Sequence, residues 1–404
     1  MVAMMRTWAF AAALVLVPSC GGRQILDLPA TTGAAAGASG GVGTGSAGMF
    51  GGAGETGVAG ASGAAGAADS RCGSVPRMLV DASSYPVTPG AVTIGVSALA
   101  VDGLDLYYVL GESGTPTSGP DIIVPIKAGA VMRVPTVGGR PIQVAGGYSF
   151  SAPLFTATSM ILGESTIDGL GVDDGAIVSI PRDGGPQTTL VNPGTRDSLL
   201  PLSDQSPLTD GTFVYYPSEN GVEAALASTD SPGTQPTLLT SESPFAMGIS
   251  GQRLLLSTAE EVKSLPLGVG DAGTETTLAT GLPDGAMAEA PCGSNACWLS
   301  EPFVSLLQID LAGDPPKTIN LGSSFSSAFN MVSDGETVFI EGAAYDSSFP
   351  TTIVSLSNDG VPSLPIVSMP QGSRALAVDD ACLYFSTSAG IFSVVRTAVG
   401  ARVP

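Results

Sequence analysis

Carboxylates are the side chains best able to do chemistry in this chain, because its 404 residues include no histidine. Without an imidazole there is no Ser-His-Asp or Cys-His catalytic group, no His-ligated metal and no ordinary general base near neutral pH. The sequence also has no G-x-S-x-G elbow, no phosphate-binding loop and no dinucleotide-binding glycine pattern. Acid–base or metal chemistry would therefore rest on Asp and Glu.

Three aspartates lie close together in the segment STIDGLGVDDGA: Asp168, Asp173 and Asp174. Oxygen ligands of this kind suit Ca²⁺, so these residues are the candidate metal ligands, and calcium is the one cofactor that the sequence suggests. The segment lacks the spacing of a calcium-binding loop, and a solvated loop is the favoured alternative. Asp379 and Asp380 fall between two apolar runs, where a structural role in a turn is favoured.

Four glutamates offer a second kind of acid–base chemistry: Glu260, Glu261, Glu289 and Glu301. A glycosidase needs two carboxylates at a defined separation, and the sequence does not bring any two of these together. A carboxylate- or calcium-dependent enzyme acting on extracellular sugars or lactones is therefore the alternative function, not the leading one.

The cysteines indicate an oxidising compartment. Cys292 and Cys297 flank the turn in APCGSNACW, so a disulfide across that hairpin is the first expectation. Cys72 and Cys382 are then left near the two ends of the folded region, where a bond between them would fasten those ends; the sequence does not decide this pairing. A zinc site made of four thiols is the rival arrangement, and their wide separation and the lack of His disfavour it.

The elements that must position these groups are repeated strand–turn–strand units. The clearest is Ser373–Ser386, SRALAVDDACLYFS, in which two apolar strands flank a polar turn. Asp-Gly between apolar runs predicts a hairpin, because Gly tolerates positive φ. Six looser copies precede this unit, with predicted turn dipeptides at Asp102-Gly103, Thr158-Ser159, Asp210-Gly211, Ser250-Gly251, Ser294-Asn295 and Asp334-Gly335.

A second alternating strand pair follows the first in most repeats, as in Gly129–Gly146 and Gly175–Asn192. One repeat thus holds four short strands, and successive turns lie 40 to 56 residues apart, close to the period of a propeller blade. We therefore predict an all-β, seven-bladed β-propeller over residues 71–404, with six or eight blades as alternatives. Because the last repeat stops after its third strand, a strand near Arg77–Asp81 is predicted to close the ring.

Aromatic residues recur at one register of the repeat, where they predict packing between blades, with carbohydrate stacking as the alternative. They are Tyr107, Tyr108, Tyr215, Tyr216, Trp298, Phe339, Tyr384 and Phe385. The insertion Gly111–Ala128 in the first repeat is the loop best suited to bind a ligand, since rigid scaffolds commonly carry function on their loops. A decorated turn is the alternative interpretation.

The chain begins with features of an exported protein. Arg6 precedes a short apolar run that ends in VPSC; the run is too short to span a bilayer and predicts a signal peptide over residues 1–19. VPSC resembles the lipobox of bacterial lipoproteins, which implies lipidation of Cys20; an ordinary cleaved signal is the alternative. Gly21 after the cysteine implies, by the same resemblance, the outer membrane or cell surface. Residues 20–70 are rich in Gly, Ala and Ser and predict a disordered tether.

The charge balance disfavours one class of partner. Lys and Arg number 15 against 36 Asp and Glu, giving a net charge of −21, which argues against nucleic acid and against direct adsorption to anionic lipid. From Val96 onward the repeats resemble the propeller lipoproteins of Gram-negative bacteria, loosely related to TolB-like, NHL and YWTD propellers. The resemblance implies the fold but no activity, because it includes no site motif. We expect a binding or scaffold module for an envelope or extracellular protein or glycan, touching the membrane only through its lipid anchor.

Overall fold

The computed structural model describes 20 segments of the chain. They are residues 71–86, 93–113, 129–147, 149–167, 173–191, 207–218, 220–227, 235–244, 246–258, 260–268, 274–280, 286–292, 295–300, 305–310, 316–321, 325–343, 351–356, 365–369, 375–397 and 401–402. Nearly all elements in these segments are β-strands; the one helical element is a 3₁₀ turn, η1 (Ala82–Ser84). No helix among them is long and apolar enough to cross a bilayer. The predicted signal peptide, Cys20 and the tether lie outside the described residues.

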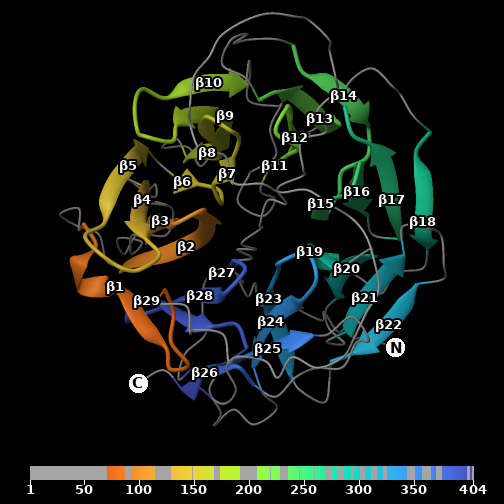
Figure 1. Cartoon of the computed structure of the whole chain (residues 1–404). Helices are drawn as coiled ribbons and strands as arrows, with labels where there is room; N and C mark the ends of the chain where they lie inside the picture. Colours follow the sequence, from red (N-terminus) through yellow and green to blue (C-terminus); the bar gives the residue numbers. More distant parts are fainter. Residues whose placement is uncertain are drawn as a thin grey trace, which may run out of the picture. The chain divides into compact units, whose positions relative to one another are not determined.

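The strands form seven sheets, one for each predicted repeat (Figure 1). Blade 1 contains β2 (Thr93–Asp102), β3 (Asp105–Ser113), β4 (Gly129–Pro135) and β5 (Ile142–Gly147). Blade 2 contains β6 (Ser149–Phe150), β7 (Leu154–Phe155), β8 (Ser159–Ile167), β9 (Asp173–Pro181) and β10 (Thr188–Val191). Blade 3 contains β11 (Leu208–Thr209), β12 (Phe213–Ser218), β13 (Gly221–Leu226) and β14 (Thr237–Thr240). Blade 4 contains β15 (Ala246–Ser250), β16 (Arg253–Ser257), β17 (Glu261–Pro266) and β18 (Thr276–Thr280).

The remaining three blades complete the set. Blade 5 contains β19 (Ala286–Cys292), β20 (Asn295–Ser300), β21 (Ser305–Asp310) and β22 (Lys317–Asn320). Blade 6 contains β23 (Ser327–Ser333), β24 (Val338–Ala343), β25 (Thr351–Leu356), β26 (Val367–Met369) and β30 (Ala401–Arg402). Blade 7 contains β27 (Leu376–Val378), β28 (Cys382–Thr387), β29 (Gly390–Val395) and β1 (Arg77–Asp81). The first to fourth strands of each blade, from the innermost outward, are called strands A to D below.

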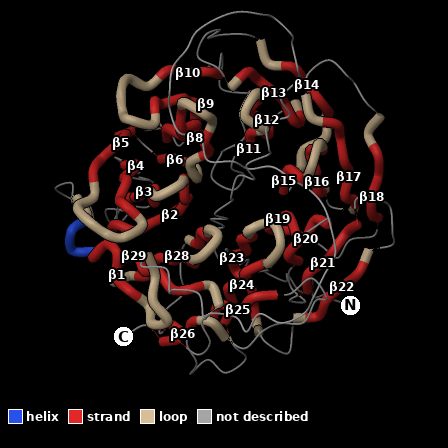
Figure 2. Tube along the Cα trace, viewed as in Figure 1, coloured by secondary structure: helices blue, strands red, loops and turns tan. Residues whose placement is uncertain are grey.

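The blades follow one another around a closed ring. Each strand A lies beside strand A of a neighbouring blade, from β7 through β11, β15, β19, β23 and β27, and β27 contacts β2 of blade 1. Blades 1 and 2 meet through β4 and β6, and Figure 2 shows the sheets arranged around a common centre. The seven-bladed β-propeller predicted from the repeats is therefore confirmed.

The hydrophobic core is divided into seven layers, one between each pair of neighbouring blades. For example, one cluster joins Leu255 and Val262 of blade 4 to Trp298 and Ile309 of blade 5. All eight repeated aromatic residues are buried within these layers, so their predicted role in packing between blades is confirmed. A small sheet cannot bury both faces alone, and neighbouring blades provide the missing cover.

The predicted closing strand occupies the expected place. β1 pairs antiparallel with β29 and becomes strand D of blade 7. Gly390 allows this pairing: its φ is +145°, and a Cβ atom there would lie only 2.1 Å from the carbonyl oxygen of Val80 in β1. The ring is thus closed by one strand from the start of the folded region and three strands from its end.

The turns of blades 1 and 4 differ from the prediction by one residue, whereas Asp210, Asp334 and Asp379 lie within their turns as predicted. Asp102 pairs with Asp105, and Ser250 pairs with Arg253, so the first residue of each predicted turn dipeptide is the last residue of strand A. The glycine that follows occupies the first central position with a positive φ, +59° for Gly103 and +57° for Gly251, as hairpin turns of types I′ and II′ require.

Two features of the strands were not predicted. Strand A of blade 2 is split into β6 and β7, which pair with different parts of β8. β30 pairs parallel with β26, so a segment that follows blade 7 in the sequence adds a fifth strand to the outer edge of blade 6. Neither feature follows the four-strand repeat. The pairing of β30 with β26 joins segments more than 30 residues apart in the sequence and consists of only two residue pairs.

Candidate functional site

The three aspartates proposed as calcium ligands remain a prediction. Asp168 lies outside the described residues, and Asp173 and Asp174 begin β9, where their backbones pair with Ile167 and Thr166. Their side chains are not described, so their convergence is untested. Among the side chains that the structure does describe, no group of three or more Asp, Glu or Cys residues is arranged to hold a metal ion.

The four glutamates proposed as an acid–base pair are also not brought together by the described geometry. Glu260 is exposed just before β17, and Glu261 is the first residue of that strand. Glu289 lies in β19, and its side chain, like the whole of Glu301, lies outside the described residues. The glycosidase hypothesis therefore gains no support from the residues that can be placed.

Glu261 instead belongs to an ion-pair network around Lys263. The Lys263 Nζ atom lies 2.9 Å from Glu275 Oε1 and 3.3 Å from Glu261 Oε2, and it donates a hydrogen bond to Glu242 Oε1. The bond to Glu242 is the largest cause that raises the pKa of Lys263 above its ordinary value, which keeps the ammonium charged. Because Glu242 follows β14 of blade 3, the network joins blades 3 and 4.

Three aspartates of the A–B turns, Asp210, Asp334 and Asp379, share one arrangement. Asp379 Oδ1 accepts the backbone N–H groups of Ala381 and Cys382 at 2.8 and 2.7 Å. Asp210 and Asp334 accept the equivalent pairs of N–H groups in their own turns. A carboxylate at this position satisfies donors that the tight turn leaves without a ladder partner. The structural role predicted for Asp379 is confirmed.

The second carboxylate oxygen of these aspartates is also used. Asp379 Oδ2 accepts the hydroxyl of Tyr384 at 2.9 Å, and Asp210 Oδ2 accepts the hydroxyl of Tyr215 at 2.7 Å. Each tyrosine lies five residues after its aspartate, on strand B. In blade 6 the residue at that register is a phenylalanine, and Asp334 Oδ2 is bonded instead by Arg396.

Turn groups connect several pairs of neighbouring blades. Gly268, in the C–D turn of blade 4, donates its N–H to the Tyr215 hydroxyl of blade 3 at 2.9 Å. Arg182, in the C–D turn of blade 2, lies 2.5 Å from Asp102 of blade 1. Arg396 of blade 7 reaches Asp334 of blade 6 in the same way. We call these contacts the turn clasps.

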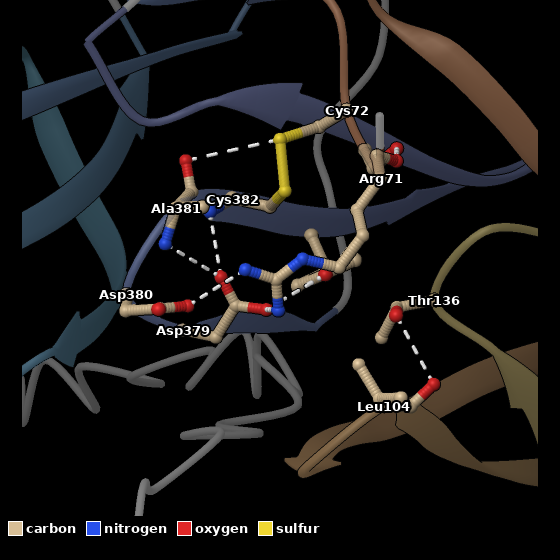
Figure 3. The surroundings of a disulfide bond; sticks show 10 residues. Arg71, Cys72, Leu104, Thr136, Asp379, Asp380, Ala381 and Cys382 are labelled. Carbon is tan, nitrogen blue, oxygen red and sulfur yellow. Dashed lines mark hydrogen bonds and ion pairs between the residues drawn. A yellow bond between two sulfur atoms is a disulfide. The ribbon is translucent and has the colours of Figure 1, made fainter. Parts of the chain in front are cut away.

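The clasp at the ring closure is the most extensive (Figure 3). Cys72 and Cys382 form a disulfide that joins residues 310 positions apart, so the pairing that the sequence left open is present. Arg71 beside it lies 3.1 Å from Asp379 Oδ2 and 2.9 Å from Asp380 Oδ1. The side chain of Arg71 is 15% exposed and that of Asp379 is 10% exposed, whereas Asp380 is 83% exposed.

Backbone contacts extend this clasp along blade 7 and into blade 1. Val395 of β29 donates its N–H to the carbonyl oxygen of Gly73 at 2.9 Å. Thr136, in the C–D turn of blade 1, lies next to the Tyr384 side chain and donates its hydroxyl to the carbonyl oxygen of Leu104 (Figure 3). Three parts of the chain therefore meet here: the segment before β1, blade 7 and blade 1.

The second predicted disulfide lies at the same register of its hairpin as the Asp–Tyr pairs. Cys292 pairs with Asn295 across the turn, as Asp102 pairs with Asp105, and Cys297 follows five residues later. Cys297 is disulfide-bonded, but the side chain of Cys292 is not described, so this pairing remains a prediction. The hairpin of blade 5 thus has cysteines where other blades have an aspartate and a tyrosine.

The described side chains of the A–B and C–D turns, which lie at the same end of the ring (the turn end), have structural roles. Burial is the largest cause that raises the phenol pKa of Tyr384, and it does the same for Tyr215, so neither phenolate is available near neutral pH. The aspartates that face them are already occupied by N–H groups, hydroxyls and arginines. What this arrangement can do is hold the blades in one rigid geometry.

Sequence reasoning missed the arginines of the clasps, Arg71, Arg182 and Arg396. Their partners are distant in sequence, as Arg71 and Asp379 are separated by 308 residues. A local signal for the aspartates was available: a tyrosine five residues after the turn aspartate occurs in the first, third and seventh repeats. The loop Gly111–Ala128 is only described up to Ser113, so its proposed binding role is untested.

The chain resembles several bacterial proteins of known structure at low similarity. No protein-family profile and no curated protein sequence matches it. An inactive virginiamycin B lyase from Staphylococcus aureus shares 10% identity over 79% of this chain and 98% of its own, with a TM-score of 0.47. BamB from Moraxella catarrhalis shares 11% sequence identity over 75% of this chain and 98% of its own, with a TM-score of 0.44. PorZ, a surface component of the type-IX secretion system of Porphyromonas gingivalis, shares 12% sequence identity over 82% of this chain and 39% of its own, with a TM-score of 0.45. At these values the likenesses carry no argument about activity or partner.

The clasp at the ring closure predicts that Asp379 contributes more to stability than its neighbour Asp380. Asp379→Asn removes the charge that faces Arg71 and the oxygen that accepts from Tyr384, so we expect the free energy of unfolding to fall by about 1–3 kcal/mol. Asp380→Asn is the matched control; its exposed ion pair should change stability by less than about 0.5 kcal/mol. Urea unfolding of the two variants measures both values, and equal losses would contradict the assigned role of Asp379.

The buried tyrosines predict an alkaline limit to stability. The phenol pKa is raised in Tyr85, Tyr107, Tyr108, Tyr215, Tyr216 and Tyr384, with burial as the largest cause in each. Absorbance at 295 nm should therefore show no more than three of the eight tyrosines ionising by pH 11 in the folded protein, whereas all eight should ionise near pH 10 in denaturant.

The same shifts fix the sign of the pH dependence. Above about pH 10 the unfolded chain releases tyrosine protons that the folded chain retains, so stability is fully present below that pH and falls as pH rises. The slope should approach about 1.4 kcal/mol per pH unit for each such tyrosine. Ionisation of six or more tyrosines in the folded state at pH 11 would be inconsistent with their burial.

Proposed function

We propose that this chain is an exported, lipid-anchored β-propeller that serves as a binding or scaffold module for a protein or glycan at the cell envelope. The observation that carries the proposal is the ring closure: a disulfide between Cys72 and Cys382 fastens β1 to blade 7. Disulfides persist in oxidising compartments outside the cytosol. A structural bond at the one point where the ring could open is consistent with an exported protein.

The use of the ionisable side chains supports binding over catalysis. In the described parts of the turn end, the aspartates cap turns and the arginines hold neighbouring blades together. These groups are committed to rigidity, and a rigid ring is a suitable platform for loops that contact a partner. The chain therefore has the properties of a scaffold whose specificity lies in its loops and edges.

The sequence before the ring supplies the proposed anchor. Cys20 would carry the lipid, and the Gly-, Ala- and Ser-rich residues after it would separate the ring from the membrane. A flexible chain of about 50 residues has a root-mean-square span on the order of 40 Å. Such a span would allow the ring to contact partners that project from the envelope while it stays attached to the outer membrane or cell surface.

Photo-crosslinking in intact cells tests the binding role and the anchor together. A photoreactive amino acid replaces Leu104, which is 72% exposed at the turn end, or Leu238, which is 50% exposed on the outer strand of blade 3. We expect mass spectrometry to recover one partner repeatedly from one of these positions. The Cys20→Ala variant should lose both incorporation of an alkyne-labelled fatty acid and at least tenfold of the cross-linked product.

Two results would count against the proposal. Fatty-acid labelling that is unaffected by Cys20→Ala would remove the lipid anchor at Cys20. Absence of any position-specific product, together with calcium-dependent turnover of a sugar or lactone by the purified chain, would replace the binding role with the enzymatic alternative. Folding of each variant is checked by its cooperative thermal transition, so that loss of cross-linking is not mistaken for unfolding.

A further inference from the structure

The outer edge of blade 6 already carries an added strand. β30 pairs parallel with β26, through Val367 with Ala401 and Ser368 with Arg402. The other strand pairs described within the blades are antiparallel. β30 thus lies outside the four-strand pattern, beside the outermost strand of blade 6.

β26 is one of the more buried outermost strands of the ring. Its first and last residues, Val367 and Met369, are fully buried and pack in the layer between blades 6 and 7. β10 and β1, the outermost strands of blades 2 and 7, also have two buried residues each, whereas β5 and β14 have none. The backbone of β26 is therefore held in place by its side chains, and its outer edge presents hydrogen-bonding groups in a fixed geometry.

A fixed edge of this kind is a template for a further strand. Parallel addition of an extended peptide to such an edge gives affinity through backbone hydrogen bonds, and side-chain contacts then select the sequence. β30 shows that the edge of β26 accepts an extended segment and fixes the direction in which that segment runs.

β30 is held weakly on β26, whereas Arg396, which precedes it in the chain, is held firmly. β30 contributes only two residue pairs, so few hydrogen bonds offset the entropy of ordering it. Five positions before β30, Arg396 is bonded to Asp334, whose side chain is 7% exposed. The clasp at Arg396 belongs to the border between blades 7 and 6 and does not depend on β30, so β30 can leave β26 without opening the ring.

We propose that the outer edge of β26 is a strand-acceptor site that β30 occupies in cis and that an extended segment of a partner protein occupies in its place. The inference rests on the proposed binding function and names the edge that carries it. The partner segment runs parallel to β26, with a small residue opposite Val367 and an arginine or lysine opposite Ser368, as in β30. A basic residue also suits a chain whose net charge is −21.

A peptide titration with purified protein tests the proposal. The probe is a fluorescein-labelled peptide with the sequence of residues 398–404, AVGARVP. One protein is the intact chain, and the other ends after Thr397 and so keeps Arg396 but lacks β30. We expect the shortened chain to bind the peptide at least tenfold more tightly, because β30 competes in the intact chain at a high effective concentration.

Two matched peptides separate strand addition from other binding. A peptide N-methylated at the positions equivalent to Ala401 and Arg402 cannot donate the ladder hydrogen bonds and should lose at least tenfold in affinity, as should a scrambled peptide. A nitroxide at one end of the peptide and then at the other reports its direction by line broadening in nuclear magnetic resonance spectra. The pattern should match parallel pairing with β26.

Several outcomes would overturn the proposal. They are equal binding to both proteins, no binding to the shortened chain, and binding that survives N-methylation. A shortened chain that forms a dimer and takes up no peptide would assign the edge to a second copy instead. If the shortened chain fails to fold, the intact chain carrying Ala401→Pro and Arg402→Pro replaces it, and failure of that folded variant to bind also refutes the site. The titration uses neither cells nor Cys20, so its failure is distinguishable from failure of the proposed function.

Discussion

Closure of the ring by β1 is the constraint on which the rest of the structure depends. The hydrophobic core is divided into seven layers between blades, so each sheet is covered only by its two neighbours. An unclosed ring would leave a sheet face and a strand edge exposed at the junction of blades 7 and 1. Pairing of β1 with β29 covers the edge of β29, and the Cys72–Cys382 disulfide and Arg71 fix the pairing in place.

The turn clasps also hold neighbouring blades together, each through a few contacts between turns. Asp210, Asp334 and Asp379 each satisfy a tight hairpin with one carboxylate oxygen and use the other to hold a tyrosine or an arginine. In three of these clasps the chain that completes the contact comes from the next blade: Gly268, Arg182 or Arg396. The result couples local turn chemistry to the contacts between blades, so that rigidity at one end of the ring does not depend on apolar packing alone.

Much of the fold could be predicted because its determinants are local and repeated. The apolar strand pairs, the turn residues and the spacing of the repeats were sufficient to predict seven blades. The incomplete last repeat pointed to β1 as the closing strand, and the shared register of Tyr107, Tyr215 and Tyr384 pointed to packing between blades. Each of these signals lies within one repeat, where side-chain period and turn chemistry act directly.

The features that escaped prediction depend on contacts between distant residues. Arg71 meets Asp379 only because the ring closes, and β30 meets β26 across a blade border with two residue pairs. No periodic pattern marks either contact. The candidate calcium ligands were chosen from spacing alone, and spacing does not determine whether Asp168, Asp173 and Asp174 share one site. Function was harder to predict than fold because the described ionisable groups serve the scaffold.

The most direct test of this account is to delete residues 71–82 from the full chain and measure unfolding by urea with circular dichroism and light scattering. The Cys72→Ala and Cys382→Ala double variant is the control, because it keeps β1 and loses only the disulfide. The account predicts that the deletion variant aggregates or loses its cooperative transition, while the control stays folded with lower stability. A deletion variant that remains soluble and unfolds at the same urea concentration as the intact chain would contradict the central role of β1.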